Sequence, residues 1–192
     1  MARITPLEGR AAAPLMLRIL NLAGKRFYGK EMTPVKILAH NPRFLLAYAG
    51  MGLFSQGKIR LAPEIRMLAM HLVAETNGCG WCMDFGGALA QRQGIDAAKM
   101  RAVGDYAASS LFSSAERAAL AYAAEATQVG ARVADTTFNA LRERFSEREI
   151  VELAVAVAAE NFYNRLNAPL EVEAQGFCAL PGQPPSMRRR SA

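Results

Sequence analysis

The sequence predicts an all-α protein whose helices pack orthogonally or as a bundle. Apolar residues recur at spacings of three and four, and prolines, glycines and capping residues divide the chain into helix-length segments. Polar and apolar residues do not alternate with a period of two for long enough to need a strand. With 192 residues, 52% of them hydrophobic, we expect one helical domain over residues 1–180. The Pro- and Arg-rich tail over residues 181–192 is predicted to be disordered.

Two helices are marked in the first half of the chain. Asn41 provides a cap and Pro42 suits the first helical position, and Gly57 stops this helix. Pro63 begins the next helix and Gly78 breaks it. The residues predicted to share one face of this second helix are Ile65, Leu68, Ala69, Leu72 and Thr76.

The second half carries further helix starts. Asp96 can cap a short helix that runs to about Val103, and Asp135 can cap another. Ser113–Glu116 and Ser146–Glu149 both fit the capping box, so each predicts a helix after it. The helix after Asp135 is expected to carry its apolar residues at Phe138, Leu141 and Phe145. The helix after Ser146 is expected to carry them at Ile150, Leu153, Ala154 and Val157.

Composition excludes several classes of function. The net charge is +6, but three of these charges belong to residues 188–190, and no Lys/Arg stripe interleaved with aromatics follows, so we expect no nucleic-acid partner. No apolar run reaches the roughly 20 residues of a membrane-spanning helix, and the first residues lack the order of a signal peptide. An odd count of three cysteines argues against secretion. A cytoplasmic protein with no membrane partner is the expectation.

The most informative motif is the C-x-x-C pair formed by Cys79 and Cys82. A helix break precedes the pair and a predicted helix over residues 83–93 follows it, so both thiols should lie at or near a helix N-terminus. Unpaired N–H groups and the helix dipole favour the thiolate there, and the thiolate is the reactive form. The pair therefore indicates a redox function.

A zinc site and an inert buried pair are the alternatives for these two cysteines. A structural zinc ion usually takes four ligands from two such pairs. The remaining candidates, Cys178, His71 and His40, are not at paired spacing, so we expect no metal.

Several segments carry a resemblance in a consistent order, namely residues 1–4, 38–42, 61–82, 115–122, 145–153 and 164–167. Through them the chain resembles the carboxymuconolactone decarboxylase family, in its alkylhydroperoxidase-D-like branch. The resemblance implies an all-helical fold, a homo-oligomer, commonly a trimer or hexamer, and thiol peroxidase activity.

The peroxidase motif of that family is E-x11-C-x2-C-x3-H, and the resemblance carries Cys79 and Cys82 onto its two cysteines. Met67 stands at the position of the acid and Gly86 at that of the histidine, so the usual proton relay is incomplete. We expect Cys79 to attack the peroxide and Cys82 to resolve the resulting sulfenic acid as a disulfide.

Three residues could replace the missing relay. Glu75 lies four residues before Cys79, Asp84 lies two residues after Cys82, and His71 lies one turn before Glu75 on the preceding helix. Each has a structural alternative, because carboxylates also serve as solvated or capping groups and a histidine on a helix face is often simply packed.

Other polar and aromatic residues near the motif have less specific interpretations. Trp81 could shield a disulfide, line a pocket for an organic hydroperoxide, or only pack, and Cys178 is interpreted as a spare thiol. Asn164, Arg165 and Asn167 are interpreted as a structural cluster that ties helices or subunits together. The sequence also contains a faint internal repeat, in which Met67–Glu75 aligns with Glu152–Glu160.

The first functional hypothesis is a thiol-dependent peroxidase or thiol–disulfide oxidoreductase without a metal or organic cofactor. It would use a peroxide or another small substrate and a dithiol or thioredoxin-like reductant. The alternatives are a redox-sensing or non-enzymatic oligomer, and a decarboxylase or lyase that would need His40 or His71 as its base. We also expect a homo-oligomer, because the predicted helices carry apolar residues beyond their main stripes, namely Met51, Leu53, Phe54, Met67 and Met70.

Overall fold

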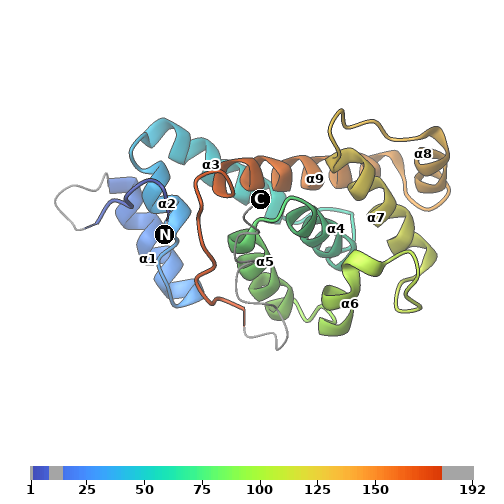
Figure 1. Cartoon of the computed structure of the whole chain (residues 1–192), viewed down its shortest axis with the longest axis horizontal. Coiled ribbons are helices and arrows are strands. Elements are labelled where there is room, and N and C mark those ends of the chain that lie inside the picture. Colours follow the sequence, from blue (N-terminus) through green and yellow to red (C-terminus); the bar gives the residue numbers. More distant parts are fainter. Residues whose placement is uncertain (1, 9–14, 179–192) are drawn as a thin grey trace, which may run out of the picture. The chain divides into compact units, whose positions relative to one another are not determined.

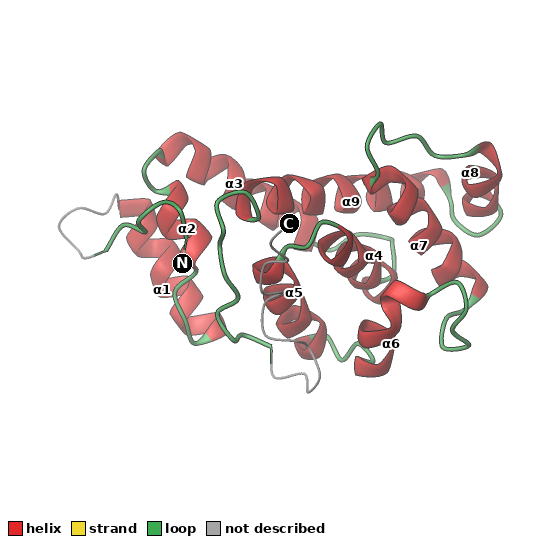
Figure 2. Cartoon of the chain, in the orientation of Figure 1, coloured by secondary structure: helices red, strands yellow, loops and turns green. Residues whose placement is uncertain are grey.

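The computed structural model describes residues 2–8 and 15–178, and the predicted tail over 181–192 lies outside them. All regular elements of the described part are helices joined by loops, as Figure 2 shows. The predicted all-α class is therefore confirmed.

The described chain forms two compact units. The single domain expected over residues 1–180 stays a prediction. The first unit comprises residues 1–57 and 169–173, and the second comprises residues 58–168 and 174–192. In chain order (Figure 1), the first unit holds α1 (Leu15–Tyr28), α2 (Thr33–Leu38) and α3 (Pro42–Gln56). The second holds α4 (Pro63–Thr76), α5 (Gly80–Arg92), α6 (Ala97–Ala102), the short 3₁₀ helix η1 (Val103–Asp105), α7 (Ser114–Thr127), α8 (Asp135–Arg142) and α9 (Glu147–Asn167).

In the first unit, α2 packs against both α1 and α3. The segment at residues 2–8 is fastened to this unit, because Thr5 O is bonded to the ring of His40 (3.0 Å) and Glu8 forms an ion pair with Lys36 (2.8 Å). Of these helices, α3 begins at Pro42 as predicted.

The centre of the second unit is α4, which packs against α5, α7 and α9. Every residue over 66–74 is buried, so the prediction of a single apolar face was too narrow. Met67 and Met70 are only 1% and 6% exposed, and they belong to the chain's own core. The expectation that these two methionines are surplus apolar surface was wrong, because three neighbouring helices cover α4 from different sides.

The caps of the second unit follow the sequence closely. Asp96 accepts a hydrogen bond from the Ala98 N–H, and both predicted capping boxes are formed. Asp135 does not cap α8, because it is the first residue of that helix and Ala134 is the N-cap. Glu125 of α7 fastens this helix start by accepting bonds from the Ala134 N–H (2.7 Å) and the Thr137 hydroxyl (2.6 Å).

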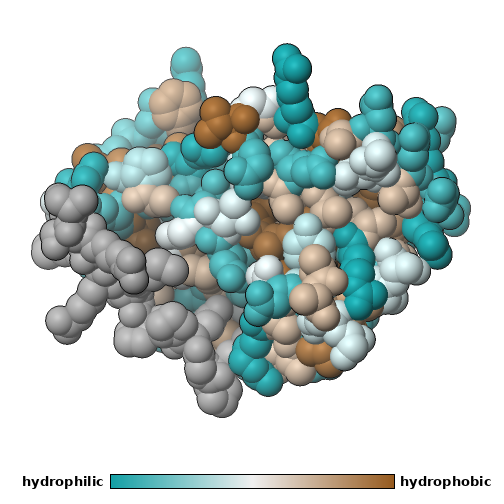
Figure 3. Space-filling model, turned by 45° about the vertical axis from the view of Figure 1, so that its right-hand side comes forward, coloured by the Kyte–Doolittle hydropathy of each residue, from teal (hydrophilic) through white to brown (hydrophobic). Residues whose placement is uncertain are grey.

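None of the helices in the described ranges is long and apolar enough to cross a membrane. Figure 3 shows one face of the molecule, on which hydrophobic residues lie in separate patches between hydrophilic ones.

Candidate functional site

The turn between α4 and α5 brings the cysteine pair to a helix start. Gly78 adopts a φ of +65°, a conformation that glycine enters at little cost. Its N–H donates to the Glu75 carbonyl and the Cys79 N–H donates to the Ala74 carbonyl, both at 3.0 Å, which are the two bonds of a Schellman motif. Cys79 therefore takes part both in the motif that closes α4 and, as the N-cap, in the start of α5.

Cys79 is the N-cap of α5, and its carbonyl accepts the first intrahelical bond from the Met83 N–H (3.0 Å). Cys82 follows in the first turn, and a disulfide joins the two sulfurs with 5.3 Å between the Cα atoms. The side chain of Cys79 makes no capping bond, so the N-terminal N–H groups of α5 are not taken by it. The two cysteines are 1% and 5% exposed. The predicted location at a helix N-terminus is confirmed.

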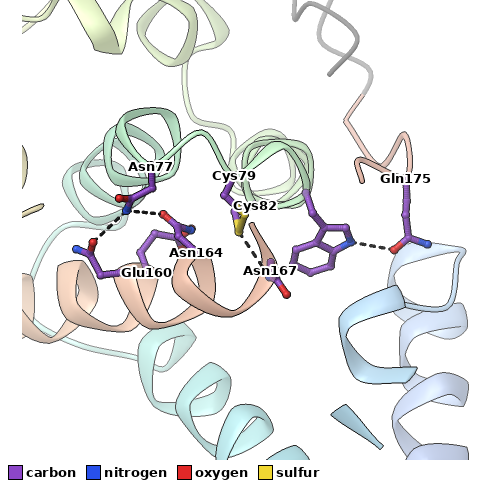
Figure 4. The surroundings of a disulfide bond; sticks show 9 residues. Asn77, Cys79, Cys82, Glu160, Asn164, Asn167 and Gln175 are labelled. Atoms are coloured by element: carbon purple, nitrogen blue, oxygen red, sulfur yellow. Dashed lines mark hydrogen bonds between the residues drawn. A yellow bond between two sulfur atoms is a disulfide. The ribbon is translucent and has the colours of Figure 1, made fainter. Parts of the chain in front are cut away.

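A row of polar side chains on α9 faces the turn and the disulfide. Asn167 donates its side-chain N–H to the sulfur of Cys82 at 3.6 Å. One turn earlier, the side-chain oxygen of Asn164 accepts from the Asn77 side chain (3.0 Å), and the side-chain N–H of Asn164 donates to the Glu160 carboxylate (2.7 Å). In Figure 4, Asn77, Asn164 and Glu160 lie to the left of the disulfide. The predicted polar cluster thus ties α4, α5 and α9 together.

Arg165 does not belong to this cluster. It is exposed, whereas Asn164 and Asn167 are buried. Positions 160, 164 and 167 share one face of α9, and position 165 lies on another. Arg165 therefore does not tie the helices of the chain together, because residues near in sequence can lie on different faces of a helix, and its predicted role between subunits stays a prediction.

Asp84 and Trp81 fasten a C-terminal segment, residues 174–178, to α5. The buried carboxylate of Asp84 accepts hydrogen bonds from the N–H groups of Gln175 (2.7 Å) and Cys178 (2.8 Å). The indole N–H of Trp81 donates to the side-chain oxygen of Gln175 at 2.8 Å, as drawn in Figure 4. We call residues 174–178 the strap.

Aromatic contacts complete the attachment of the strap. The rings of Trp81 and Phe85 stack with their centroids 4.9 Å apart, and Phe177 meets both rings edge-on at 6.2 and 5.5 Å. Trp81 is therefore packed on the strap side of α5. Asp84 has a visible structural task, and its predicted chemical role stays a prediction.

His71 lies on the face of α4 that packs against α5. A Cβ atom at Gly86 would be 4.0 Å from the Nδ1 atom of His71. The side chain is buried, and Nδ1 has no hydrogen-bond partner. Burial lowers the pKa of His71 to about 4, so the imidazole is neutral at pH 7.

Glu75 is directed to a different neighbour. Its carboxylate lies against η1, where a Cβ atom at Gly104 would be 2.7 Å from Oε1. Partial burial and the nearby charge of Asp105 raise the pKa of Glu75. The structure thus places Glu75 over η1, and its role as a proton acceptor for the thiols stays a prediction.

Glu160 and Asn77 are site residues that the sequence reasoning missed. Glu160 is buried, and burial raises its pKa to about 7, while the bond from Asn164 acts in the opposite direction. The faint internal repeat between Met67–Glu75 and Glu152–Glu160 was the signal in the sequence that could have singled out Glu160. Asn77 lies in the predicted helix break before the cysteine pair, and its side chain carries bonds to α9.

No group of three or more His, Cys, Asp and Glu side chains among the described residues could hold a metal ion.

The site can now be compared with known proteins. The sequence pattern of the carboxymuconolactone decarboxylase family matches residues 42–125, which include α4, the cysteine pair and α5. The uncharacterised protein YnjA of Escherichia coli strain K12 is 31% identical over 170 residues, covering 88% of this chain and 93% of YnjA. This chain belongs to the carboxymuconolactone decarboxylase family. The resemblance in the sequence is thereby confirmed.

Solved structures share the fold of this chain. The alkylhydroperoxidase AhpD core of a peroxidase-related protein from Ralstonia eutropha JMP134 superposes with a TM-score of 0.80 at 21% identity, over 92% of this chain and 94% of that one. The debrominase Bmp8 superposes with a TM-score of 0.78 at 24% identity, over 91% and 92% of the two chains. At these identities the likeness establishes the AhpD-like fold alone.

Proposed function

We propose that this family member is a thiol-dependent peroxidase, or more broadly a thiol–disulfide oxidoreductase, that cycles Cys79 and Cys82 between dithiol and disulfide. The observation that carries the proposal is the disulfide across the first turn of α5, with Cys79 as N-cap. The family membership and the peroxidase-related neighbour from Ralstonia support it.

In this cycle the Cys79 thiolate attacks a peroxide oxygen, an S–O bond forms, and the O–O bond breaks. The leaving alkoxide takes up a proton and departs as the alcohol. The Cys82 thiolate then attacks the sulfenic acid of Cys79, the S–S bond forms, and the displaced hydroxide leaves as water with one proton. A dithiol or thioredoxin-like reductant restores both thiols and is itself oxidised. We infer a cytoplasmic setting for this reductant and a homo-oligomeric enzyme, a trimer or hexamer.

Each sulfur has its own source of stabilisation as a thiolate. Cys79 lies at the N-terminus of α5, where the helix dipole and free N–H groups favour negative charge. Cys82 instead accepts the N–H of Asn167. We keep Cys79 as the attacking thiol, and single-cysteine variants decide between the two orders.

Reductive removal of a halogen from an aromatic ring is a second candidate. The debrominase Bmp8 shares the fold, and a cysteine-to-alanine variant of it has been solved in complex with 2,3,4-tribromopyrrole. In this chain Trp81 stands between the two cysteines in sequence, and its ring contacts those of Phe85 and Phe177. The dithiol would supply two electrons, a C–H bond would replace the carbon–halogen bond, and halide, a proton and the disulfide would be the other products.

The test is peroxide consumption coupled to a dithiol reductant. We expect activity in the wild type and in Cys178→Ser, the matched control, and loss of turnover in Cys79→Ser and Cys82→Ser. Peroxide should also remove two titratable thiols and two hydrogens of mass. If both thiols stay free under peroxide and oxidised glutathione, the proposal is wrong. A disulfide that forms without turnover favours the redox-sensing alternative, and turnover of a bromopyrrole alone favours dehalogenation.

A further inference from the structure

One buried polar atom of the second unit lacks a hydrogen-bond partner where α4 packs against α5. Nδ1 of His71 is buried without a hydrogen bond, which typically costs about 1–3 kcal/mol. It lies 4.0 Å from the place where a Cβ atom would stand at Gly86. Because residue 86 is glycine, no side chain from α5 fills that space, and the imidazole of α4 points to it.

The face of α5 that His71 approaches is the face that carries the sulfurs. Positions 79, 82 and 86 are spaced by three and four residues, so they share one side of the helix. Positions 82 and 86 are one turn apart, with about 5–6 Å between Cβ positions on neighbouring turns. A side chain that reaches residue 86 from α4 is therefore directed at the surroundings of Cys82.

The other buried ionisable side chains of α4, α5 and α9 have separate neighbours or positions. Asp84 lies on the strap side of α5, where it holds two backbone N–H groups. Glu160 is bonded to Asn164 on α9. Arg66 precedes His71 by five residues, so it projects from a different side of α4. The low pKa of His71 has burial as its cause.

We propose that His71 is the proton acceptor for the Cys82 thiol and reaches it from α4 through the gap that Gly86 leaves. The proposal rests on the thiol–disulfide cycle proposed above and assigns its missing base. When the disulfide is open, Nδ1 takes the thiol proton and the Cys82 thiolate attacks the sulfenic acid of Cys79. The S–O bond breaks as the S–S bond forms, and the proton held by His71 leaves with the hydroxide as water.

A thiolate beside the imidazole should also change the proton affinity of His71. With the disulfide closed the ring is neutral and buried. With the pair reduced, an adjacent negative charge favours the imidazolium, and a charge at this distance typically shifts a pKa by about 1–3 units. The histidine titration followed by NMR should therefore move upward on reduction of the unmodified protein.

The decisive experiment measures the alkylation rate of Cys82 against pH in a Cys79→Ser background, a readout that needs no peroxide turnover. Adding His71→Asn should lower the rate near neutral pH by about tenfold, corresponding to a thiol pKa raised by about one unit. Adding Gly86→His to His71→Asn should restore the rate, because it supplies an imidazole to the same space from the other helix. The matched control is His40→Asn in the first unit, whose ring is bonded to Thr5, and it should leave the profile unchanged.

An unchanged profile in His71→Asn would overturn the proposal, as would a loss that Gly86→His does not reverse, since packing would then explain it. If His71→Asn does not fold, the NMR titration of the wild type decides, and a histidine pKa that is the same in both redox states overturns the proposal. These outcomes are distinct from failure of the proposed function, which shows as a wild type that does not consume peroxide.

Discussion

Two buried ionisable residues in the second unit have proton affinities displaced in opposite directions. Burial lowers the pKa of His71 from 6.5 to about 4 and raises that of Glu160 from 4.5 to about 7. In both cases the neutral form is the one that the folded protein prefers. Both side chains are therefore uncharged in the core over much of the range between pH 4.5 and 7, and each ties stability to pH.

Because of Glu160, the wild type should become less stable as pH rises towards 7. We predict that the Glu160→Gln variant does not lose stability in this way. The folded protein binds the Glu160 proton more tightly than the unfolded chain does, so the contribution of this proton is complete below pH 4.5 and disappears as pH passes through about 7. The stability of the variant relative to wild type should therefore increase across that window, by up to about 3 kcal/mol for a shift from 4.5 to about 7.

Denaturant unfolding at several pH values between these limits measures this difference. Glu143→Gln, at an exposed position, is the matched control and should show no such trend. His71 acts in the opposite direction, because its contribution is lost as pH falls from 6.5 to about 4, and the comparison of Glu160→Gln with wild type cancels it. A constant difference between variant and wild type would contradict the prediction.

At the scale of residues, the sequence predicted the cysteine pair and its place at a helix start, because spacing and capping are local properties. It named His71 but could not show that Nδ1 faces Gly86, since that contact depends on how α4 packs against α5. Glu160 was hidden for the same reason. A glutamate on a long helix is usually solvated, and the burial of this one depends on how α9 packs against the other helices of the second unit.

At the scale of elements, α5 presents two different faces to its surroundings. The face with Cys79 and Cys82 meets α9 through Asn167, whereas the face with Trp81 and Asp84 meets the strap. The start of α5 was predictable from the turn that precedes it. The strap was not, because its residues have no periodicity and its bonds to α5 span more than 90 positions of sequence.

We predict that Asp84→Ala releases the strap and exposes Trp81. The variant loses two hydrogen bonds between a carboxylate and backbone N–H groups, each worth about 1.5–3 kcal/mol. Trp81 is the one tryptophan in the sequence and is 4% exposed, so its fluorescence reports on this side of α5 alone. Its emission should move to longer wavelength, and added iodide should quench it more strongly.

Asp96→Ala is the matched control for the strap. It removes a similar bond between a carboxylate and a backbone N–H, at the start of α6. That variant should keep the emission of the wild type. Equal emission in Asp84→Ala and the wild type would mean that the aromatic contacts alone hold the strap.

At the scale of the whole molecule, the described helices leave apolar side chains uncovered. On α9, Val151, Val155 and Phe162 are exposed and share one face of the helix, with Ala158 between them. Exposed Glu147 and Arg165 stand at the two ends of this stripe. A second copy of α9 related by a two-fold axis perpendicular to the helix would run antiparallel and bring Glu147 of each chain opposite Arg165 of the other.

The apolar surface that the described residues offer to a predicted homo-oligomer differs in part from the one that the sequence indicated. The sequence singled out Met67 and Met70, which the chain buries itself, since a helix that is apolar on all sides fits a core as well as an interface. Leu53 is exposed as that argument requires. Periodicity shows which residues avoid water, but not whether the same chain or another covers them.

We predict that Val155→Glu reduces the size of the assembly, because the pairing of two α9 stripes would place two carboxylates in an apolar contact. Light scattering at micromolar concentration should give a multiple of the 20.8 kDa chain for the wild type. Family resemblance implies three or six chains, and the two-fold pairing of α9 fits six, so the variant should give a smaller particle. Val129→Glu is the matched control, since Val129 is 99% exposed in the loop between α7 and α8, and it should leave the mass unchanged. A wild-type mass near 20.8 kDa would contradict the homo-oligomer, and a Val155→Glu particle as large as the wild type would show that the copies meet through another surface.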